Sequence, residues 1–207
     1  MNAKPDPEAY FRSNLIDEYY KRAGLRDRQI ALRKGANEML EEFRTPGGLA
    51  GSRLSNEWLG QHGWKIQMVP IIGLKLPEEE LLGPLLPALG EFGVSEIIGG
   101  TFNAPLGEIS PVWILEWAEE NLDTFLNLHR TDYHMVWSED RRFAIHGNDG
   151  DFDVYAGPEY LIRAALPPFL IGAAATRKNA EEIEWEHGPG SMDAVLEHYA
   201  PFMLDDD

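Results

Sequence analysis

Histidine and aspartate side chains in residues 133–166 have the types and the spacing that could do chemistry. His134 and His146 lie in two neighbouring runs of alternating residues, and Asp151 and Asp153 lie in a third run. If these runs are adjacent antiparallel strands, the two histidines can face each other with a carboxylate beside them. Such a group could bind a metal ion or form a proton-transfer pair. The simpler interpretation is that both histidines are exposed on their strands, because spacing alone is weak support for a site.

The alternating aspartates also have the spacing of calcium ligands. They are Asp149, Asp151 and Asp153. An EF-hand loop requires glycine at its sixth position and glutamate at its twelfth. Counted from Asp149, these positions hold Val154 and Tyr160, so the motif fails. We expect instead a polar hairpin whose alternating acids lie on one exposed face of a strand.

Other catalytic motifs are missing from the sequence. The absence of cysteine excludes disulfides, thiolate catalysis and Cys-based zinc sites. No histidine pair has the His-Glu-x-x-His form, no serine lies in Gly-x-Ser-x-Gly, and the glycine-rich segment 45–52 lacks the ending of a phosphate loop. We therefore expect no cofactor and no metal ion, and a binding protein in place of an enzyme. The tryptophans are predicted as core or rim residues and not as a sugar platform: Trp113, Trp117, Trp137 and Trp185.

Charge is the most informative property of the composition. The formal net charge is −17. Residues 1–44 hold nine Lys/Arg and eight Asp/Glu, and residues 45–207 hold nine Lys/Arg and 27 Asp/Glu. The charge is thus +1 in the first part and −18 in the second. Such a field repels nucleic acid and anionic membranes and attracts cationic partners.

Targeting signals are also missing from the sequence. The N-terminal segment MNAKPDPEAYF has no apolar region of the kind that a secretory signal requires. The apolar stretch 161–175 is broken by Arg163, Pro167 and Pro168, so it does not predict a membrane span. We expect a cytoplasmic protein without membrane or nucleic-acid partners.

Turn signals divide residues 133–166 into three short strands and a helix. Ser138-Glu139-Asp140 predicts one turn, and the Gly-Asn-Asp-Gly run 147–150 predicts a hairpin, because these residues tolerate positive φ. Gly157-Pro158-Glu159 ends the third strand and begins a helix. The sequence therefore predicts the α+β class, with an antiparallel β-meander and helices packed on one face. The predicted strands are 133–137, 143–146 and 152–156.

The first 44 residues predict a helical hairpin. Asp6-Pro7-Glu8 is a helix start, and apolar residues at helical spacing follow as far as Tyr20. A second helix is predicted to begin near Arg26. Its core stripe is Leu32, Ala36, Met39, Leu40 and Phe43.

The middle of the chain is predicted to be mixed. Ser110-Pro111 opens the clearest predicted helix, which continues to about Leu126. Ser191 caps a final helix. The other expected elements are a strand over 64–69, short helical pieces over 76–92 and a brief strand over 94–98.

The whole chain is expected to form one domain. A chain of 207 residues can bury a core large enough to be stable without disulfides. No long polar tract interrupts the apolar residues, so we predict a single α+β domain over residues 1–207. Disorder is predicted only at the ends, near 1–6 and 204–207.

Three groups of acidic residues are the candidate partner-binding surfaces. The acids of the predicted helix 110–126 share one side with no interleaved base, which weakens a helix by a few tenths of a kcal/mol per pair. A solvated helix face is the simpler interpretation, and a docking surface for a cationic partner is the functional one. The groups are Glu116, Glu119, Glu120 and Asp123; Asp149, Asp151 and Asp153; and Glu181, Glu182 and Glu184.

One segment resembles a known class of proteins. Residues 137–162 read WSEDRRFAIHGNDGDFDVYAGPEYLI. This run resembles the C-terminal part of bacterial immunity proteins of the polymorphic-toxin systems, which often end in a strand meander followed by a helix that begins at glycine. The resemblance implies a cytosolic protein that binds and neutralises a cognate toxin domain. Many such toxins are basic nucleases, and the acidic charge fits a cationic partner independently.

Three hypotheses for function follow. The first is an acidic binding protein of the immunity type. The second is an enzyme with a site of histidine and carboxylate residues. The third is an acidic structural or phage-type interaction protein, including a nucleic-acid mimic. Convergence of His134, His146 and Asp151 in a deep pocket would favour the enzyme.

Overall fold

The structure is a computed structural model, which describes residues 20–22, 26–44, 50–71, 81–103, 106, 112–115, 117–148 and 151–206. The described strands are β1 (Tyr20–Arg22), β2 (Leu40–Arg44), β3 (Ala50–Leu54), β4 (Lys65–Pro70), β5 (Ile97–Thr101), β6 (Val112–Leu115), β7 (His134–Ser138), β8 (Ala144–Asn148) and β9 (Phe152–Gly157). The described helices are α2 (Arg26–Glu38), α3 (Asn56–His62), α5 (Leu85–Glu91), α6 (Glu119–Leu128), α7 (Glu159–Ala165), α8 (Ala173–His187) and α9 (Asp193–Tyr199), with the 3-10 helices η2 (Pro168–Leu170) and η3 (Ala200–Phe202).

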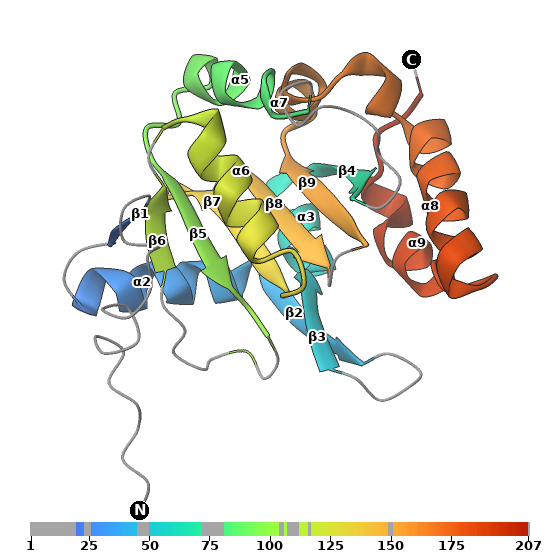
Figure 1. The fold of residues 1–207 in the computed structure, drawn as a ribbon, viewed down its shortest axis with the longest axis horizontal. Coiled ribbons are helices and arrows are strands. Elements are labelled where there is room, and N and C mark those ends of the chain that lie inside the picture. The colour runs from blue at the N-terminus through green and yellow to red at the C-terminus, as the bar shows by residue number, and fades with distance from the viewer. Residues whose placement is uncertain are drawn as a thin grey trace, which may run out of the picture.

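An antiparallel sheet forms the centre of the molecule (Figure 1). Seven of the described strands follow the order β1-β6-β5-β7-β8-β9-β4, and β2 and β3 form a separate hairpin. β7, β8 and β9 are neighbours both in the chain and in the sheet. The predicted meander and the α+β class are therefore confirmed. The strands predicted over 64–69 and 94–98 correspond to β4 and β5.

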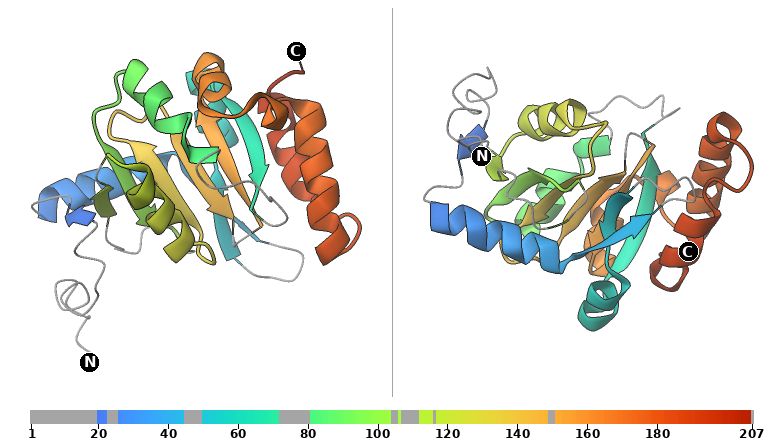
Figure 2. Two further views of the ribbon diagram at one scale, coloured as in Figure 1. Left: turned by 45° about the horizontal axis from the view of Figure 1, so that its top comes forward. Right: turned by 90° about the horizontal axis from the view of Figure 1, so that it is seen from below.

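Both faces of the sheet are covered (Figure 2). Apolar residues of α5, α6 and α7 pack on one face, and those of α2, α3, α9 and the β2–β3 hairpin pack on the other. The prediction of helices on one face is therefore wrong. In β7, Met135, Val136 and Trp137 are all buried, although successive side chains of a strand point to opposite faces. A strand that is apolar on both sides requires cover on both sides.

The predicted helical hairpin over 1–44 is confirmed only in its second helix, which begins at Arg26, and is wrong at the described residues on either side of it. The predicted helical residues 7–19 lie outside the described residues, and Tyr20 belongs to β1, which pairs with β6. The second helix, α2, ends at Glu38, and β2 follows in place of its last turns. Leu40 and Phe43 fit a helical stripe, but the segment forms a ladder with β3. Such a tertiary partner overrides local helical spacing.

The helix predicted from Ser110 begins later than expected. β6 occupies the apolar run Val112–Leu115, between β1 and β5 in the sheet. The helix itself, α6, starts at Glu119, and Leu122 and Phe125 are buried as predicted. A short run of consecutive apolar residues suits a buried strand as well as a helix, and the two neighbouring strands decide between them.

The segment after α9 is held in place by hydrogen bonds. The Leu204 amide donates to the Ile66 carbonyl at 3.1 Å, and the Leu204 side chain is buried. The Asp206 carboxylate accepts a hydrogen bond from the Ala174 amide at 2.8 Å. The predicted disorder is therefore wrong for residues 204–206, while the predicted disordered segment 1–6 lies outside the described residues. No described helix is long and apolar enough to cross a bilayer.

Candidate functional site

The two strand histidines point to opposite faces of the sheet. In the register of β7 and β8, His134 lies opposite Gly147, and His146 lies opposite Met135. Residues opposite each other share a face, and successive residues alternate, so His134 and His146 cannot meet. Both side chains are buried, with 1% exposure. The predicted pair is not formed, and the prediction of exposed strand histidines is also wrong.

His134 packs beneath α6 and faces a carboxylate. Its Nε2 atom lies 3.5 Å from Asp153 Oδ1 on β9, which makes an ion pair and not a hydrogen bond. Its Nδ1 atom donates to the Asp132 carbonyl oxygen at 3.1 Å. Gly147 of β8 lies between His134 on β7 and Asp153 on β9, and a Cβ atom there would overlap the His134 ring. Burial alone would lower the pKa of His134, but Asp153 outweighs it, so the pKa is raised.

Asp151 and Asp153 do not form the exposed acidic strand face that the sequence predicts. Asp153 is 6% exposed and pairs with His134 inside the molecule. Asp151 lies before β9 at the surface, where its Oδ1 atom is 3.0 Å from His187 Nε2. Asp149 lies outside the described residues. Among the described side chains, no group of three His, Asp or Glu could hold a metal ion.

His146 lies on the other face and borders a cavity. The Ser52 hydroxyl is 3.2 Å from its Nε2 atom. Burial lowers the pKa of His146 to about 3, so the ring is neutral. The cavity has a volume of about 340 Å³ and lies between the β2–β3 hairpin, β8, β9 and α9. Its apolar wall includes Phe43, Phe152 and Val154.

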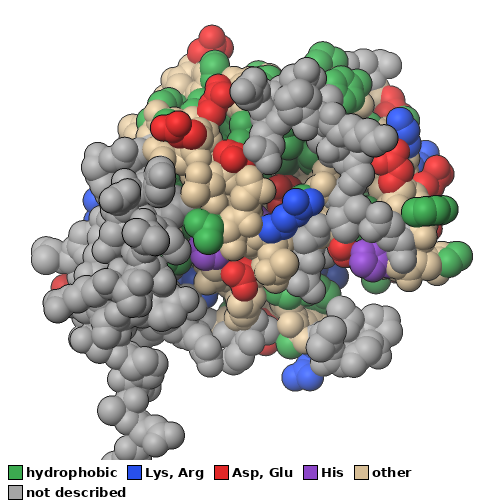
Figure 3. All heavy atoms as spheres, in the orientation of Figure 1, with side chains coloured by type: hydrophobic (Ala, Val, Ile, Leu, Met, Phe, Trp, Pro, Cys, Tyr) green, Lys and Arg blue, Asp and Glu red, His purple; other side chains and the backbone are tan. Residues whose placement is uncertain are grey.

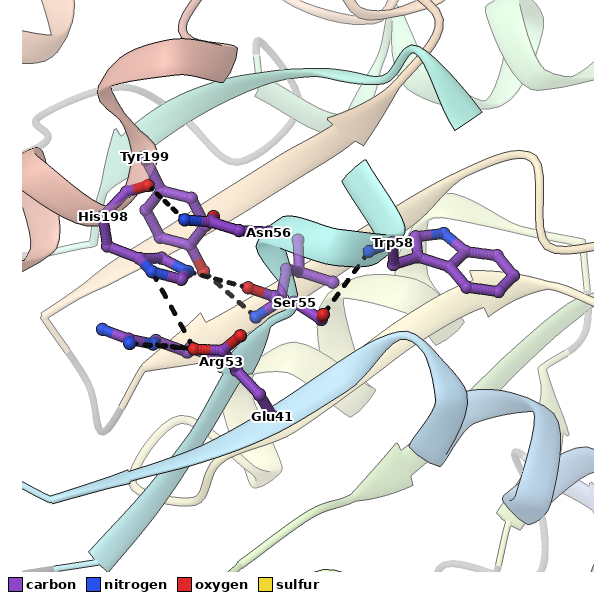
Figure 4. Close-up of polar contacts among 8 residues, drawn as sticks. Glu41, Arg53, Ser55, Asn56, Trp58, His198 and Tyr199 are labelled. Carbon is purple, nitrogen blue, oxygen red and sulfur yellow. Dashed lines mark hydrogen bonds and ion pairs between the residues drawn. The ribbon is translucent and has the colours of Figure 1, made fainter. Parts of the chain in front are cut away.

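Two residues of α9 fix one wall of this cavity to β3 (Figure 4). The Tyr199 hydroxyl accepts a hydrogen bond from the Leu54 amide at 3.1 Å. His198 Nε2 donates to the Leu54 carbonyl at 2.9 Å, and the Asn56 side chain donates to the His198 carbonyl at 3.0 Å. Burial raises the pKa of Tyr199 and lowers that of His198. Both side chains are therefore neutral near pH 7.

An ion pair fixes the opposite wall of the cavity. Arg53 on β3 donates to Glu41 on β2 at 2.9 Å, and the Arg53 guanidinium lies 5.4 Å from the ring centre of Phe43. Glu42, the next residue of β2, accepts a hydrogen bond from the Leu106 amide at 2.6 Å. Arg44 is exposed at the rim, and its side chain has no hydrogen-bond or ion-pair partner within the described part of the chain.

The acids of α6 have a structural explanation. Glu119 and Glu120 lie in the first turn, where the helix dipole stabilises negative charge. Asp123 accepts a hydrogen bond from the Asn127 side chain at 2.9 Å. Glu116, the fourth predicted member of this group, lies outside the described residues. Nearby Trp117 is 43% exposed, and its ring packs near Gly90 of α5.

The acids of α8 surround the most exposed aromatic side chain described. Trp185 is 87% exposed. Glu181 and Glu182 precede it by four and three residues, so all three lie on one helix face. Figure 3 shows acidic and hydrophobic side chains together at the right-hand edge, where Figure 1 places α8. We call Glu181, Glu182 and Trp185 the α8 surface.

Glu181 and Glu182 have no hydrogen-bond or ion-pair partner among the described residues, whereas Glu184 accepts a hydrogen bond from the Met192 amide at 3.3 Å. The sequence predicted these three acids as a partner surface but placed Trp185 in the core or at its rim. The exposure of Trp185 could have been predicted from the helical stripe of buried residues in α8, because Trp185 points away from that stripe. That stripe is Thr176, Asn179, Ala180 and Ile183.

Comparisons with known proteins add no assignment. No family model, no curated protein and no solved structure matches the chain.

Proposed function

We propose that this chain is a binding protein whose α8 surface docks a basic protein partner. The supporting observation is the 87% exposure of Trp185 beside two carboxylates, Glu181 and Glu182, whose side chains lack partners among the described residues. Burying a large apolar side chain contributes about 1.5–3 kcal/mol, and tryptophan is enriched among the residues that dominate interfaces. The neighbouring carboxylates favour a cationic partner and speed its approach.

The charge of the surrounding segment supports the same partner. Residues 179–207 contain nine Asp/Glu and no Lys/Arg. Unlike the acids of α6, Glu184 lies in the last turn of its helix, where the helix dipole disfavours negative charge. The fold therefore explains the acids of α6 and binds Glu184 to the Met192 amide, but among the described residues it gives no stabilising partner to Glu181 and Glu182. A cationic protein would be such a partner.

We further propose that the partner is a toxin domain and that binding neutralises it. The resemblance of residues 137–162 to bacterial immunity proteins motivates this step, and with it a cytoplasmic location. An interface of ordinary size buries about 800 Å² per partner, so it would extend beyond the α8 surface. The enzyme hypothesis required His134, His146 and Asp151 to converge, and they lie apart. A nucleic-acid mimic would need carboxylates over an extended face, and a central tryptophan does not fit that pattern.

Co-expression with the product of the adjacent gene tests the proposal. The wild-type chain is expected to restore growth and to co-purify with that product. Trp185→Ala is expected to weaken the complex by about 2 kcal/mol, which is roughly 30-fold in Kd. The matched control is Trp117→Ala, which removes a tryptophan beside the other acidic helix and is expected to bind like the wild type.

Charge-reversal variants further distinguish the role of the acids of α8 from that of the acids of α6. The double variant Glu181→Lys/Glu182→Lys is expected to slow association at low salt by about tenfold or more. The same change in α6, Glu119→Lys/Glu120→Lys, is expected to leave association within a few-fold of wild type. The proposal is overturned if the adjacent product neither co-purifies nor is neutralised, or if the α8 variants bind as well as the α6 variants.

A further inference from the structure

We infer that the cavity beside His146 is a binding site for a small molecule with an apolar body and one anionic group. This inference is independent of the proposed partner, because Trp185 does not line the cavity. The volume of about 340 Å³ falls within the range of small-molecule sites, about 300 to 1,000 Å³. The cavity also combines an apolar wall with a few polar groups, as such sites do.

The inner wall selects for an apolar body. Phe152 and Val154 on β9 are buried, and Phe43 of the hairpin and Val195 of α9 line the cavity from other sides. Two titratable rings, His146 and Tyr199, are among the inner lining residues, and burial keeps both neutral. A charged group would therefore lose its hydration in the inner part of the cavity without gaining a counter-charge.

The rim selects for an anion. Two guanidinium groups, Arg44 and Arg53, line the cavity with one carboxylate, Glu42. Because Arg53 is already paired with Glu41, Arg44 supplies the positive charge that a ligand can meet. Glu42 is bound to the Leu106 amide. Arg44 is exposed and has no partner within the described residues, so its guanidinium can meet a carboxylate or sulfonate. In a chain of net charge −17, local cations are needed for an anion to bind at all.

The walls are fixed before any ligand arrives. The hydrogen bonds of Tyr199 and His198 to Leu54 join α9 to β3, and the Arg53–Glu41 ion pair joins β3 to β2. A site that is already formed does not spend binding free energy on ordering its own side chains. The ligand is thus expected to bind without rearrangement of the surrounding strands.

Two fluorescent probes of nearly the same shape test the inference. The anionic probe is 8-anilinonaphthalene-1-sulfonate, and the neutral probe is N-phenyl-1-naphthylamine. Both are expected to bind the full chain, and Arg44→Ala is expected to weaken the anionic probe by about tenfold while leaving the neutral probe unchanged. Decanoate is expected to displace the anionic probe, and decanol to displace it less well.

A variant that fills the cavity controls for binding elsewhere. Ala194 is an exposed residue of α9 at the cavity, so Ala194→Trp can close it without burying a new side chain in the core. This variant is expected to lose both probes, whereas Ala164→Trp, at an exposed position of α7 on the other face, is expected to keep both. Near-ultraviolet circular dichroism checks that each variant is folded. The inference is overturned if folded Ala194→Trp binds the probes like the wild type, or if Arg44→Ala weakens both probes equally.

Discussion

The two buried histidines of the sheet have opposite pKa shifts, although solvent reaches neither of them. Each is 1% exposed, and an offset of one residue in the strand register places them on opposite faces. His134 lies against the Asp153 carboxylate, and its pKa is raised. His146 lies beside the Ser52 hydroxyl, and burial lowers its pKa to about 3. Burial lowers the pKa of both rings, and the carboxylate that faces His134 reverses the shift there.

The largest loss of stability is expected from a side chain at Gly147, which would occupy the space of the His134 ring. Gly147→Ala is expected to lower the free energy of unfolding by about 3 kcal/mol or more, because its methyl group overlaps the His134 ring and separates it from Asp153. Urea denaturation measures this loss. The control is Gly60→Ala in α3, where the nearest side-chain atom would be 3.8 Å away. That change is expected to stabilise the protein by about 0.5–1 kcal/mol, and similar losses for both variants would refute the close approach.

The next effect is acid destabilisation through His146. Its pKa in the folded state lies below the ordinary value of 6.5, so its contribution to stability is complete above pH 6.5 and is lost as the pH falls toward 3. The loss is expected to be about 1.4 kcal/mol per pH unit within this window. Denaturation of the wild type and of His146→Gln between pH 4.5 and 7 measures the difference. Parallel pH curves for the two proteins would contradict a neutral His146.

Removing the Asp153 carboxylate tests the raised pKa of His134, the opposite of the shift at His146. Because the pKa of His134 is raised, the stability from its pair with Asp153 is complete below pH 6.5 and is lost as the pH rises through the folded-state value. Asp153→Asn is expected to cost about 2 kcal/mol at pH 6 and less at higher pH. A proton NMR titration of His134 should also show a lower pKa in the variant. An unchanged titration would mean that Asp153 is not the cause.

The smallest effect is expected at Ser52. Ser52→Ala removes a neutral hydrogen-bonding group and is expected to cost about 1 kcal/mol. The pKa of His146 should stay low in this variant, because burial is the main cause of its shift. Calorimetric unfolding at pH 7 and an NMR titration measure the two quantities. A loss as large as that of Asp153→Asn would remove the contrast between the two histidines.

The same register explains which parts of this arrangement the sequence could predict. Turn residues at 138–140 and 147–150 marked the three strands of the meander, and all three are present. Alternation could not fix their register, because apolar residues of β7 are buried on both faces. The turn that sets the register contains Arg141 at a φ of 57°, a conformation that is uncommon for arginine. Without the register, neither the separation of the histidines nor the pairing of Asp153 could be predicted.

The acidic surfaces show a similar limit. The sequence located the acids of α6 and α8 correctly on helices or beside them. It could not show which of the two groups has a structural explanation within the fold. That difference depends on where each helix begins, because β6 displaces the start of α6 to Glu119 and so places Glu119 and Glu120 in its first turn. It depends equally on the buried stripe of α8, which turns Trp185 outward. The cavity beside His146 was not predictable, because its walls come from segments that are far apart in the chain.

The hydrogen bond between Asp206 and the Ala174 amide has a consequence for the timing of folding. Gly172 precedes α8 and has no side chain to cap it, so a carboxylate more than 30 residues later supplies the acceptor. A side chain at Gly172 would collide with that carboxylate. During synthesis, α8 therefore stays uncapped until residue 206 has left the ribosome. This hydrogen bond forms late, so α8 is expected to reach its full stability only after most of the sheet has formed.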